Sequence, residues 1–293
     1  MNISVVGSKG LAASLAKKGT VSDIALYNTS FQGDYFTFVE PEIYPEKVQT
    51  LFQAIAMTQF TLLYVKRELP KQTLGECIVA LDMLKAKGAI ILDGVEKAEI
   101  SPLLGQTSLK DWPVLENNTA KIMTLLASSQ PSKVSGGPKI LIDHAFLVKN
   151  VGTVALGTML SGEIKKYEKL TLFPANKEVM IKSIQIHDKD YDKAGCWDRV
   201  GLCLKGVDAD EVKRGYIIGA GVPCQKEIKI NLVKNIFFKD EVPKTVMCTI
   251  GMQYQRAELN GNILTFDSPL ALNGEIILLV PEKKMRIVGL ANI

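Results

Sequence analysis

The 293-residue sequence contains no apolar run approaching the roughly 20 uninterrupted residues that a membrane-spanning helix requires. Its opening residues, MNISVVGSKG, lack the basic and then apolar layout of a secretory signal peptide. We therefore expect a soluble cytoplasmic protein with no membrane partner. The hydrophobic content of 47% and charged content of 23% are those of a globular chain, and the length suffices for two or three domains.

Metal-binding and nucleophilic residues are scarce. The five cysteines form no CxxC pair and have no histidine nearby at ligand spacing: Cys77, Cys196, Cys203, Cys224 and Cys248. We expect buried free thiols rather than zinc ligands or disulfides. His144 and His187 are far apart in the sequence and suggest no dyad. With no Ser/His/Asp or Cys/His set either, the sequence predicts no catalytic residue, no metal and no cofactor.

The net charge of +4 is too small to indicate a nucleic-acid-binding protein by itself. Its distribution is uneven, with 12 Lys and Arg against 13 Asp and Glu up to Leu126, and 23 against 18 from Ala127 onward. If a polyanion binds, we expect it in the carboxyl-terminal part. A solvated surface with no polyanion is the alternative.

The first 126 residues alternate short apolar runs with amphipathic helical segments, which is typical of an α/β domain. Val48, Leu51, Phe52 and Ile55 recur at helical spacing, so residues 46–56 are predicted to form a helix. The other expected elements are strands at Asn2–Val6, Thr61–Val65 and Ala89–Leu92, and helix faces marked by Leu11, Ala12 and Leu15 and by Leu74, Ile78 and Leu81. This order predicts a parallel sheet with right-handed crossovers.

The composition changes after this region. Residues 128–138 are rich in Ser, Gly and Pro, which indicates a connection between domains. Beyond Lys139, short runs rich in Val, Ile, Leu and Thr are broken about every ten residues, as in barrels or sandwiches. We expect an α/β domain over 1–126, a linker over 127–138, and all-β domains over 139–224 and 225–293.

The segment Ile142–Gly219 resembles the second domain of translational GTPases of the EF-Tu class, and among these it is most similar to the archaeal selenocysteine-specific factor, SelB. The landmarks, in order, are Val151-Gly-Thr-Val154, Gly157, Ser161-Gly162, Ser183-Ile-Gln-Ile-His187, Asp198-Arg-Val-Gly201, Lys205-Gly-Val207 and Arg214-Gly215. Residues 228–293 resemble the third domain of the class. The resemblance implies a GTPase-like α/β domain followed by two β-barrels, without the winged-helix extension of SelB.

The residues that hold GTP in this class are missing. A P-loop, GxxxxGK[ST], cradles phosphates with backbone amides, while its Lys neutralises them and its Ser or Thr binds Mg²⁺. With Gly7 and Ser14 setting the register, the second Gly and the Lys become Ala12 and Ala13. Lys9 is the alternative cation, but it lies four positions early. We interpret the loop as a degenerate P-loop, in which only backbone amides remain for an anion.

The other two nucleotide signatures also differ from the family. The DxxG motif and its following His, which hold Mg²⁺ and position water, align with Val39, Glu42 and Ile43, and only Pro41 persists. The guanine-reading NKxD motif becomes Asp93-Gly-Val-Glu96. The combined loss predicts that the fold persists while GTP binding and hydrolysis do not.

The resemblance implies a protein that binds tRNA or the translation machinery, such as the ribosome or a translation factor, without GTP. In the family the second domain forms part of the pocket for the aminoacylated tRNA end, and the residues matching that surface are Arg199, Lys205 and Arg214. Cations suit phosphates, and guanidinium groups can stack on bases. A pseudo-GTPase that serves as a protein-binding scaffold or regulatory subunit is the alternative. An active GTPase with atypical motifs is a third.

Overall fold

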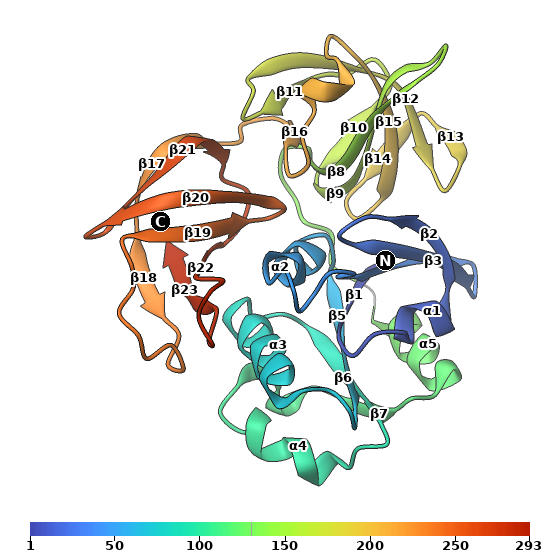
Figure 1. Cartoon of the computed structure of the whole chain (residues 1–293). Helices are drawn as coiled ribbons and strands as arrows, with labels where there is room; N and C mark the ends of the chain where they lie inside the picture. Colours follow the sequence, from blue (N-terminus) through green and yellow to red (C-terminus); the bar gives the residue numbers. More distant parts are fainter. Residues whose placement is uncertain (130) are drawn as a thin grey trace. The chain divides into compact units, whose positions relative to one another are not determined.

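The computed structural model describes residues 1–129 and 131–293, and Figure 1 shows its helices and strands. The described residues fall into two compact units. Unit 1 comprises residues 1–131, 233–241 and 277–290. Unit 2 comprises residues 132–232, 242–276 and 291–293. The predicted linker over 127–138 includes residue 130, which lies outside the described residues, and helix α5 extends into its start, ending at Ser128.

A seven-stranded sheet forms the centre of unit 1, in the order β2-β3-β4-β1-β5-β6-β7. The strands are β1 (Asn2–Gly7), β2 (Lys17–Val21), β3 (Ala25–Phe31), β4 (Asp34–Glu40), β5 (Phe60–Lys66), β6 (Gly88–Asp93) and β7 (Val114–Glu116). The predicted parallel pairing is confirmed for β1, β5 and β6, and β4 and β7 extend the parallel part of the sheet on either side. Strands β2 and β3 add an antiparallel meander, because such strands need only short turns between them.

The helices of this unit are α1 (Leu11–Leu15), α2 (Gln49–Ala56), α3 (Lys71–Met83), α4 (Lys97–Leu104) and α5 (Thr119–Ser128), with a 3₁₀ turn, η1, at Ser108–Asp111. Helix α2 begins three residues later than the predicted Glu46, because residues 41–47 form turns in which the Tyr44 amide donates to Pro41 and the Lys47 amide to Ile43. One apolar core includes Ile3, Phe38, Leu62, Ile91 and Ile122.

Six antiparallel strands of unit 2 close into a barrel in the order β11-β16-β8-β9-β15-β12, with β12 pairing back to β11. They are β8 (Lys139–Val148), β9 (Gly152–Ser161), β11 (Lys169–Phe173), β12 (Lys177–Ile186), β15 (Arg199–Lys205) and β16 (Ile217–Gly219). Short strands β10 (Glu163–Lys165), β13 (Lys189–Tyr191) and β14 (Lys193–Gly195) and the 3₁₀ turn η2 (Ala209–Glu211) accompany them. Alternate side chains such as Ile140, Ile142, Val179 and Leu202 fill the interior.

The second β-domain, a half-barrel, contributes strands to both units. In unit 2, β17 (Cys224–Lys229), β21 (Ile263–Ala271), β20 (Gln253–Asn260) and β19 (Thr245–Ile250) pair as an antiparallel sheet. The remaining strands are β18 (Asn231–Lys234), β22 (Ile276–Leu279) and β23 (Ile287–Asn292). In the described residues after 138, η2 is the only helical segment, so the all-β prediction is confirmed. No helix in the described part of the chain is long and apolar enough to cross a membrane.

Candidate functional site

The loop after β1 turns at two glycines with positive φ. Gly7 has φ of +97°, and a Cβ there would lie 2.4 Å from the carbonyl oxygen of Tyr64, so only glycine fits. Gly10 has φ of +100° and precedes α1. Helix α1 has only five residues, too few to contribute a substantial dipole. The loop therefore keeps two glycine-dependent turns, and the short helix α1 begins directly after the second.

The side chains of this loop are engaged within the protein. Ala12 is buried in the core, whereas Ala13 and Ser14 are exposed. The Ser14 hydroxyl donates to the carbonyl of Leu11 at 2.8 Å, one turn back along the helix. Lys9 donates through Nζ to the carbonyl of Glu42. The predicted degenerate positions are thus near one another, and the nearby lysine points to a backbone carbonyl.

A carboxylate that the sequence interpretation did not single out lies against the loop. Glu40, the last residue of β4, accepts a hydrogen bond from the Gly10 amide at 3.1 Å and one from the Tyr27 hydroxyl at 3.5 Å. The residue is only 3% exposed. Burial raises the pKa of Glu40, with the nearby Glu42 charge acting in the same direction, although the Gly10 hydrogen bond opposes it. The detectable sequence signal was an acid directly after the apolar pair Phe38 and Val39 at the end of the strand.

The segment that follows β4 has no arrangement suited to Mg²⁺. Val39 belongs to the core and is 1% exposed, and Glu42 and Ile43 are half-buried. The amides of Glu42 and Ile43 both donate to the carbonyl of Asp23. Within the described ranges, 1–129 and 131–293, no three His, Cys, Asp or Glu side chains are grouped as metal ligands.

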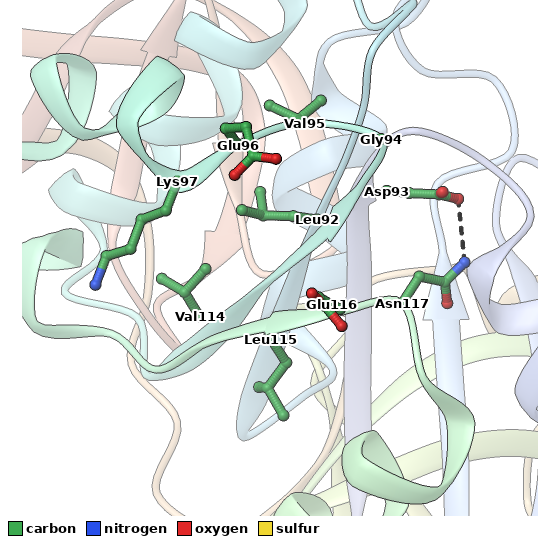
Figure 2. Close-up of a pocket in the computed structure, with 10 residues that line it drawn as sticks. All are labelled: Leu92, Asp93, Gly94, Val95, Glu96, Lys97, Val114, Leu115, Glu116 and Asn117. Atoms are coloured by element: carbon green, nitrogen blue, oxygen red, sulfur yellow. Dashed lines mark hydrogen bonds between the residues drawn. The ribbon is translucent and has the colours of Figure 1, made fainter.

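The carboxyl ends of β5, β6 and β7 bring together a polar cluster that was missed as a set (Figure 2). Asp93 accepts hydrogen bonds on one carboxylate oxygen from the Tyr64 hydroxyl at 2.6 Å and the Asn117 side chain at 3.1 Å. These hydrogen bonds lower the pKa of Asp93. Parallel strands place such side chains at one edge, where α/β folds bind ligands. Sequence spacing alone does not reveal that they converge.

Beside this cluster lies an open pocket of about 520 Å³, lined by residues 92–97 and 114–117 (Figure 2). Its rim carries three acids, Asp93, Glu96 and Glu116, and one base, Lys97. Glu96 is also used internally, because its side chain and that of Glu99 form a capping box at the start of α4. Asp93 and Glu96, the two acids at the position of the NKxD motif, therefore accept hydrogen bonds from groups of the protein itself.

In the barrel, Arg199 forms a buried ion pair. Its two terminal nitrogens donate to the two carboxylate oxygens of Asp143 at 2.9 and 2.7 Å, and His144 Nδ1 lies 3.2 Å from the same carboxylate. The side chains of Arg199 and Asp143 are 14% and 3% exposed. Burial by itself would raise the pKa of Asp143, but the Arg199 charge and hydrogen bonds from His144 and Arg199 outweigh it, and the pKa is lowered.

The three basic residues suggested as RNA contacts are not one cluster. Lys205 is exposed at the far end of β15, six residues from Arg199, which is roughly 20 Å along a strand. Arg214 is half-buried beside Gly215, whose amide donates to Ile142 at 2.8 Å, so it lies near the end of β8 that carries Asp143. Arg214 and Arg199 thus share one region, and Lys205 lies apart.

Comparison with known proteins gives consistent matches. The model of elongation factor Tu domain 2 matches residues 152–219. An uncharacterized protein of Methanocaldococcus jannaschii is 36% identical over 295 residues, covering 97% of this chain and 94% of that protein. The selenocysteine-specific elongation factor of the same organism is 28% identical over 249 residues, covering 77% of this chain and 52% of the factor. The chain therefore spans about half of that factor's length.

Solved structures agree on the fold. SelB from Methanococcus maripaludis, in complex with the GTP analogue GppNHp, superposes with a TM-score of 0.83 at 22% identity, covering 100% of this chain and 78% of that one. A bacterial selenocysteine-specific factor gives a TM-score of 0.82 at 18% identity, covering 100% of this chain and 57% of that one. At these identities the likeness concerns the architecture alone.

Proposed function

Because this chain belongs to the SelB-like family of translation elongation factor homologues, we propose that it is a non-catalytic member that binds tRNA or the translation machinery without GTP. The Glu40 carboxylate on the Gly10 amide is the observation that carries the proposal. A phosphate bound to the same loop would meet the buried Glu40 carboxylate, which already accepts from the Gly10 amide. Two neighbouring negative charges in a poorly solvated site repel strongly.

Further support comes from the remaining nucleotide positions. Ala13 has no charge to offer a triphosphate, and Val39 is an apolar core residue. Asp93 accepts hydrogen bonds from Tyr64 and Asn117 on one carboxylate oxygen, so part of its accepting capacity is already used within the protein. Each substitution alone weakens nucleotide binding, and together they remove contacts to phosphate, metal and base.

Isothermal titration calorimetry with GTP, GDP and Mg²⁺ tests the absence of nucleotide binding. We expect no saturable heat for the natural protein, and none for Ala13→Lys, because Glu40 still occupies the loop in that variant. A dissociation constant in the low micromolar range, equivalent to about 8 kcal/mol, would contradict the proposal and favour an active GTPase with atypical motifs.

For the RNA, we infer a contact surface on the closed barrel. Lys205 is exposed and suited to a phosphate, while Arg214 is half-buried and precedes Gly215, whose amide donates to Ile142 next to Asp143 in β8. Arg199 has both terminal nitrogens engaged, so its proposed role is to shape the surface rather than to neutralise phosphate. Titration with aminoacylated and uncharged tRNA tests this. Tighter binding of the aminoacylated form supports recognition of the charged end, and no binding of either form at low salt would exclude tRNA as the ligand.

A protein-binding scaffold is the second candidate function. A set of exposed apolar side chains in unit 1 favours it. Val233, Ile236 and Phe237 are 52%, 66% and 56% exposed. The loop is rigidly held, because Asn235 donates to the Ile287 carbonyl at 3.1 Å and accepts from the Phe237 amide at 3.1 Å. Large apolar side chains displayed by an ordered loop are typical of protein contacts.

The two candidates respond to different substitutions. Binding to purified ribosomal subunits is measured for Ile236→Ser with Phe237→Ser, and for Lys205→Ala with Arg214→Ala. Loss only in the first variant supports protein docking, whereas loss only in the second supports RNA contact. Thermal unfolding serves as the folding control, since both pairs contain exposed or half-exposed side chains.

A further inference from the structure

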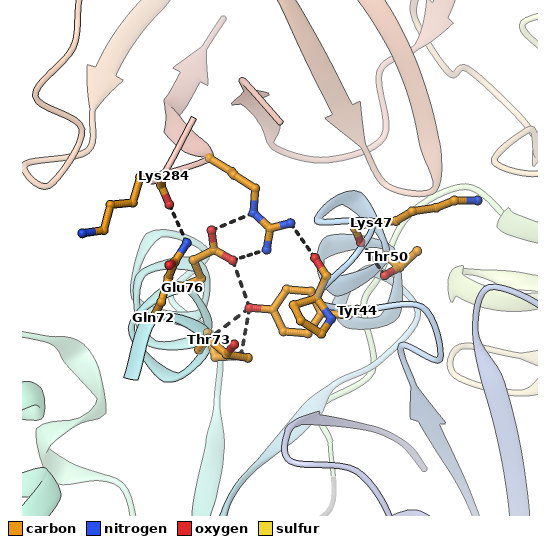
Figure 3. A network of polar contacts seen from close by, with 10 residues as sticks. Tyr44, Lys47, Thr50, Gln72, Thr73, Glu76 and Lys284 are labelled. Carbon is orange, nitrogen blue, oxygen red and sulfur yellow. Dashed lines mark hydrogen bonds and ion pairs between the residues drawn. The ribbon is translucent and has the colours of Figure 1, made fainter. Parts of the chain in front are cut away.

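A fully buried carboxylate lies on α3. Glu76 is 0% exposed, and its neighbours on the helix, Thr73 and Cys77, are buried as well. Figure 3 shows Glu76 facing Tyr44, whose hydroxyl lies 3.2 Å from Oε2. An ionised carboxylate in such a place is tolerated only with a cationic partner and further hydrogen bonds.

Arg286 supplies that partner from the segment between β22 and β23. Its Nε donates to Glu76 Oε1 at 2.9 Å, and its Nη2 donates to Oε2. The remaining nitrogen, Nη1, donates to the carbonyl of Pro45. All three guanidinium nitrogens are therefore used, two on α3 and one on the turn that follows β4. A lysine ammonium cannot reproduce this planar three-point contact.

Other contacts connect the same pieces of unit 1. The Arg286 guanidinium lies 5.9 Å from the centre of the Tyr44 ring, within the range of a cation–π contact. The Gln72 side chain donates to the Lys284 carbonyl at 2.8 Å (Figure 3). Burial raises the pKa of Tyr44, so its hydroxyl stays protonated and can donate to Glu76 or to the Thr73 carbonyl at 3.3 Å.

The turn that this cluster holds is the one in which the DxxG motif was sought. In GTP-driven switch proteins, the corresponding segment is ordered by γ-phosphate and Mg²⁺ and is released on hydrolysis. Here residues 41–47 include Tyr44 and Pro45, which Glu76 and Arg286 bind directly. The Arg286–Glu76 ion pair joins parts of the same chain and itself involves no nucleotide atom.

We propose that Tyr44, Glu76 and Arg286 form a permanent latch that orders residues 41–48 and fixes them to residues 284–286 without nucleotide. The proposal deepens the function proposed above and rests on it for its biological meaning. The latch replaces a ligand-dependent contact with an internal one. The segment, which in switch proteins alternates between an ordered and a released conformation, then has the ordered conformation only. A single arrangement of the turn and α3 then persists throughout the protein's working cycle.

Hydrogen–deuterium exchange of the full chain tests the latch. The amides of Glu42, Ile43, Tyr44 and Lys47 each donate to a backbone carbonyl, so their exchange reports opening of the turn. In Arg286→Gln we expect these amides to exchange at least ~10-fold faster than in the natural protein, because local opening governs exchange. Arg286→Lys keeps the charge and the fold while losing the fork, and we expect faster exchange there too.

Lys283→Gln is the matched control, since Lys283 lies in the same segment and pairs with Asp240 at 3.2 Å on the surface. Unchanged exchange in Arg286→Lys, or equal acceleration in Lys283→Gln, would overturn the latch. The natural protein is also measured with and without GTP and Mg²⁺. If GTP slows exchange at residues 7–14 while the Arg286 effect persists, the proposed function fails and the latch stands. If GTP has no effect and Arg286 substitution has none either, only the latch fails.

Discussion

Three carboxylates are buried among the described residues, and they differ in what stabilises them. Glu76 and Asp143 each face an arginine fork, whereas Glu40 has the Gly10 amide and the Tyr27 hydroxyl. An amide and a phenol offset burial less than a full positive charge does. Burial and the Glu42 charge therefore raise the pKa of Glu40 against the opposing Gly10 amide and Lys9 charge, whereas at Asp143 the Arg199 charge outweighs burial and the pKa is lowered.

At Glu40, this shift predicts a pH dependence of stability. Because burial raises the pKa of the folded state above the ordinary 4.5, the stability that Glu40 contributes is present below pH 4.5 and is lost as the pH rises through the folded value. Glu40→Gln cannot ionise, so we expect its free energy of unfolding to gain on the natural protein as the pH rises. Urea denaturation at several pH values measures this. Glu46→Gln, an exposed neighbour, is the control, and equal pH profiles for both variants would contradict the assignment.

At Arg199, we predict a structural rather than a ligand-binding effect. Arg199→Met leaves the Asp143 charge buried and should destabilise the protein by about 3–5 kcal/mol. Asp143→Leu combined with Arg199→Met should recover most of that loss, because no unpaired charge remains. Denaturant unfolding of both variants measures this. If Arg199→Met keeps full stability but loses tRNA binding, Arg199 contacts the ligand instead.

At the scale of elements, a matched pair of glycines tests how α3 and β6 are built. A Cβ added at Gly75, inside α3, would have no neighbouring atom within 4 Å, whereas a Cβ at Gly88 would lie 2.1 Å from the Thr61 carbonyl and 2.5 Å from the Trp112 ring. Gly75→Ala should stabilise by about 0.5–1 kcal/mol through helix propensity. Gly88→Ala should destabilise by about 1–3 kcal/mol through overpacking where β6 begins beside β5. The midpoint of urea unfolding is measured for both variants. Equal changes in stability would contradict the predicted overpacking at Gly88.

For the whole molecule, RNA binding would be governed by salt. Each phosphate neutralised by a lysine or arginine releases counterions, so log affinity should fall linearly with log salt. Lys205→Ala should reduce the steepness of that slope by about one unit. Lys110→Ala, an exposed lysine of the α/β domain, serves as the control. Fluorescence anisotropy with labelled tRNA at several salt concentrations measures both, and identical slopes in the natural and Lys205→Ala proteins would move the contact elsewhere.

The sequence by itself determined the classes of element and the family. Apolar periodicity located α2, α3, β1, β5 and β6, because a buried face has to repeat with the period of its element. The segment Ile142–Gly219 indicated the closed barrel through its resemblance to the second domain of the EF-Tu class, whereas the spacing of short apolar runs left barrels and sandwiches open. The missing P-loop lysine was equally visible, since that motif is contiguous in the chain.

Only the tertiary structure decided which polar groups meet. Glu40 lies 30 residues from Gly10, Asp143 lies 56 from Arg199, and Glu76 lies 210 from Arg286. No local sequence pattern encodes these pairs, because their residues meet only when the strands take their order in the sheets and the chain folds back on itself. The antiparallel β2–β3 meander escaped prediction for a related reason: it depends on pairing along the edge of a sheet rather than on hydrophobic period. Burial then sets the chemistry, because a carboxylate removed from water must find its partner within the fold.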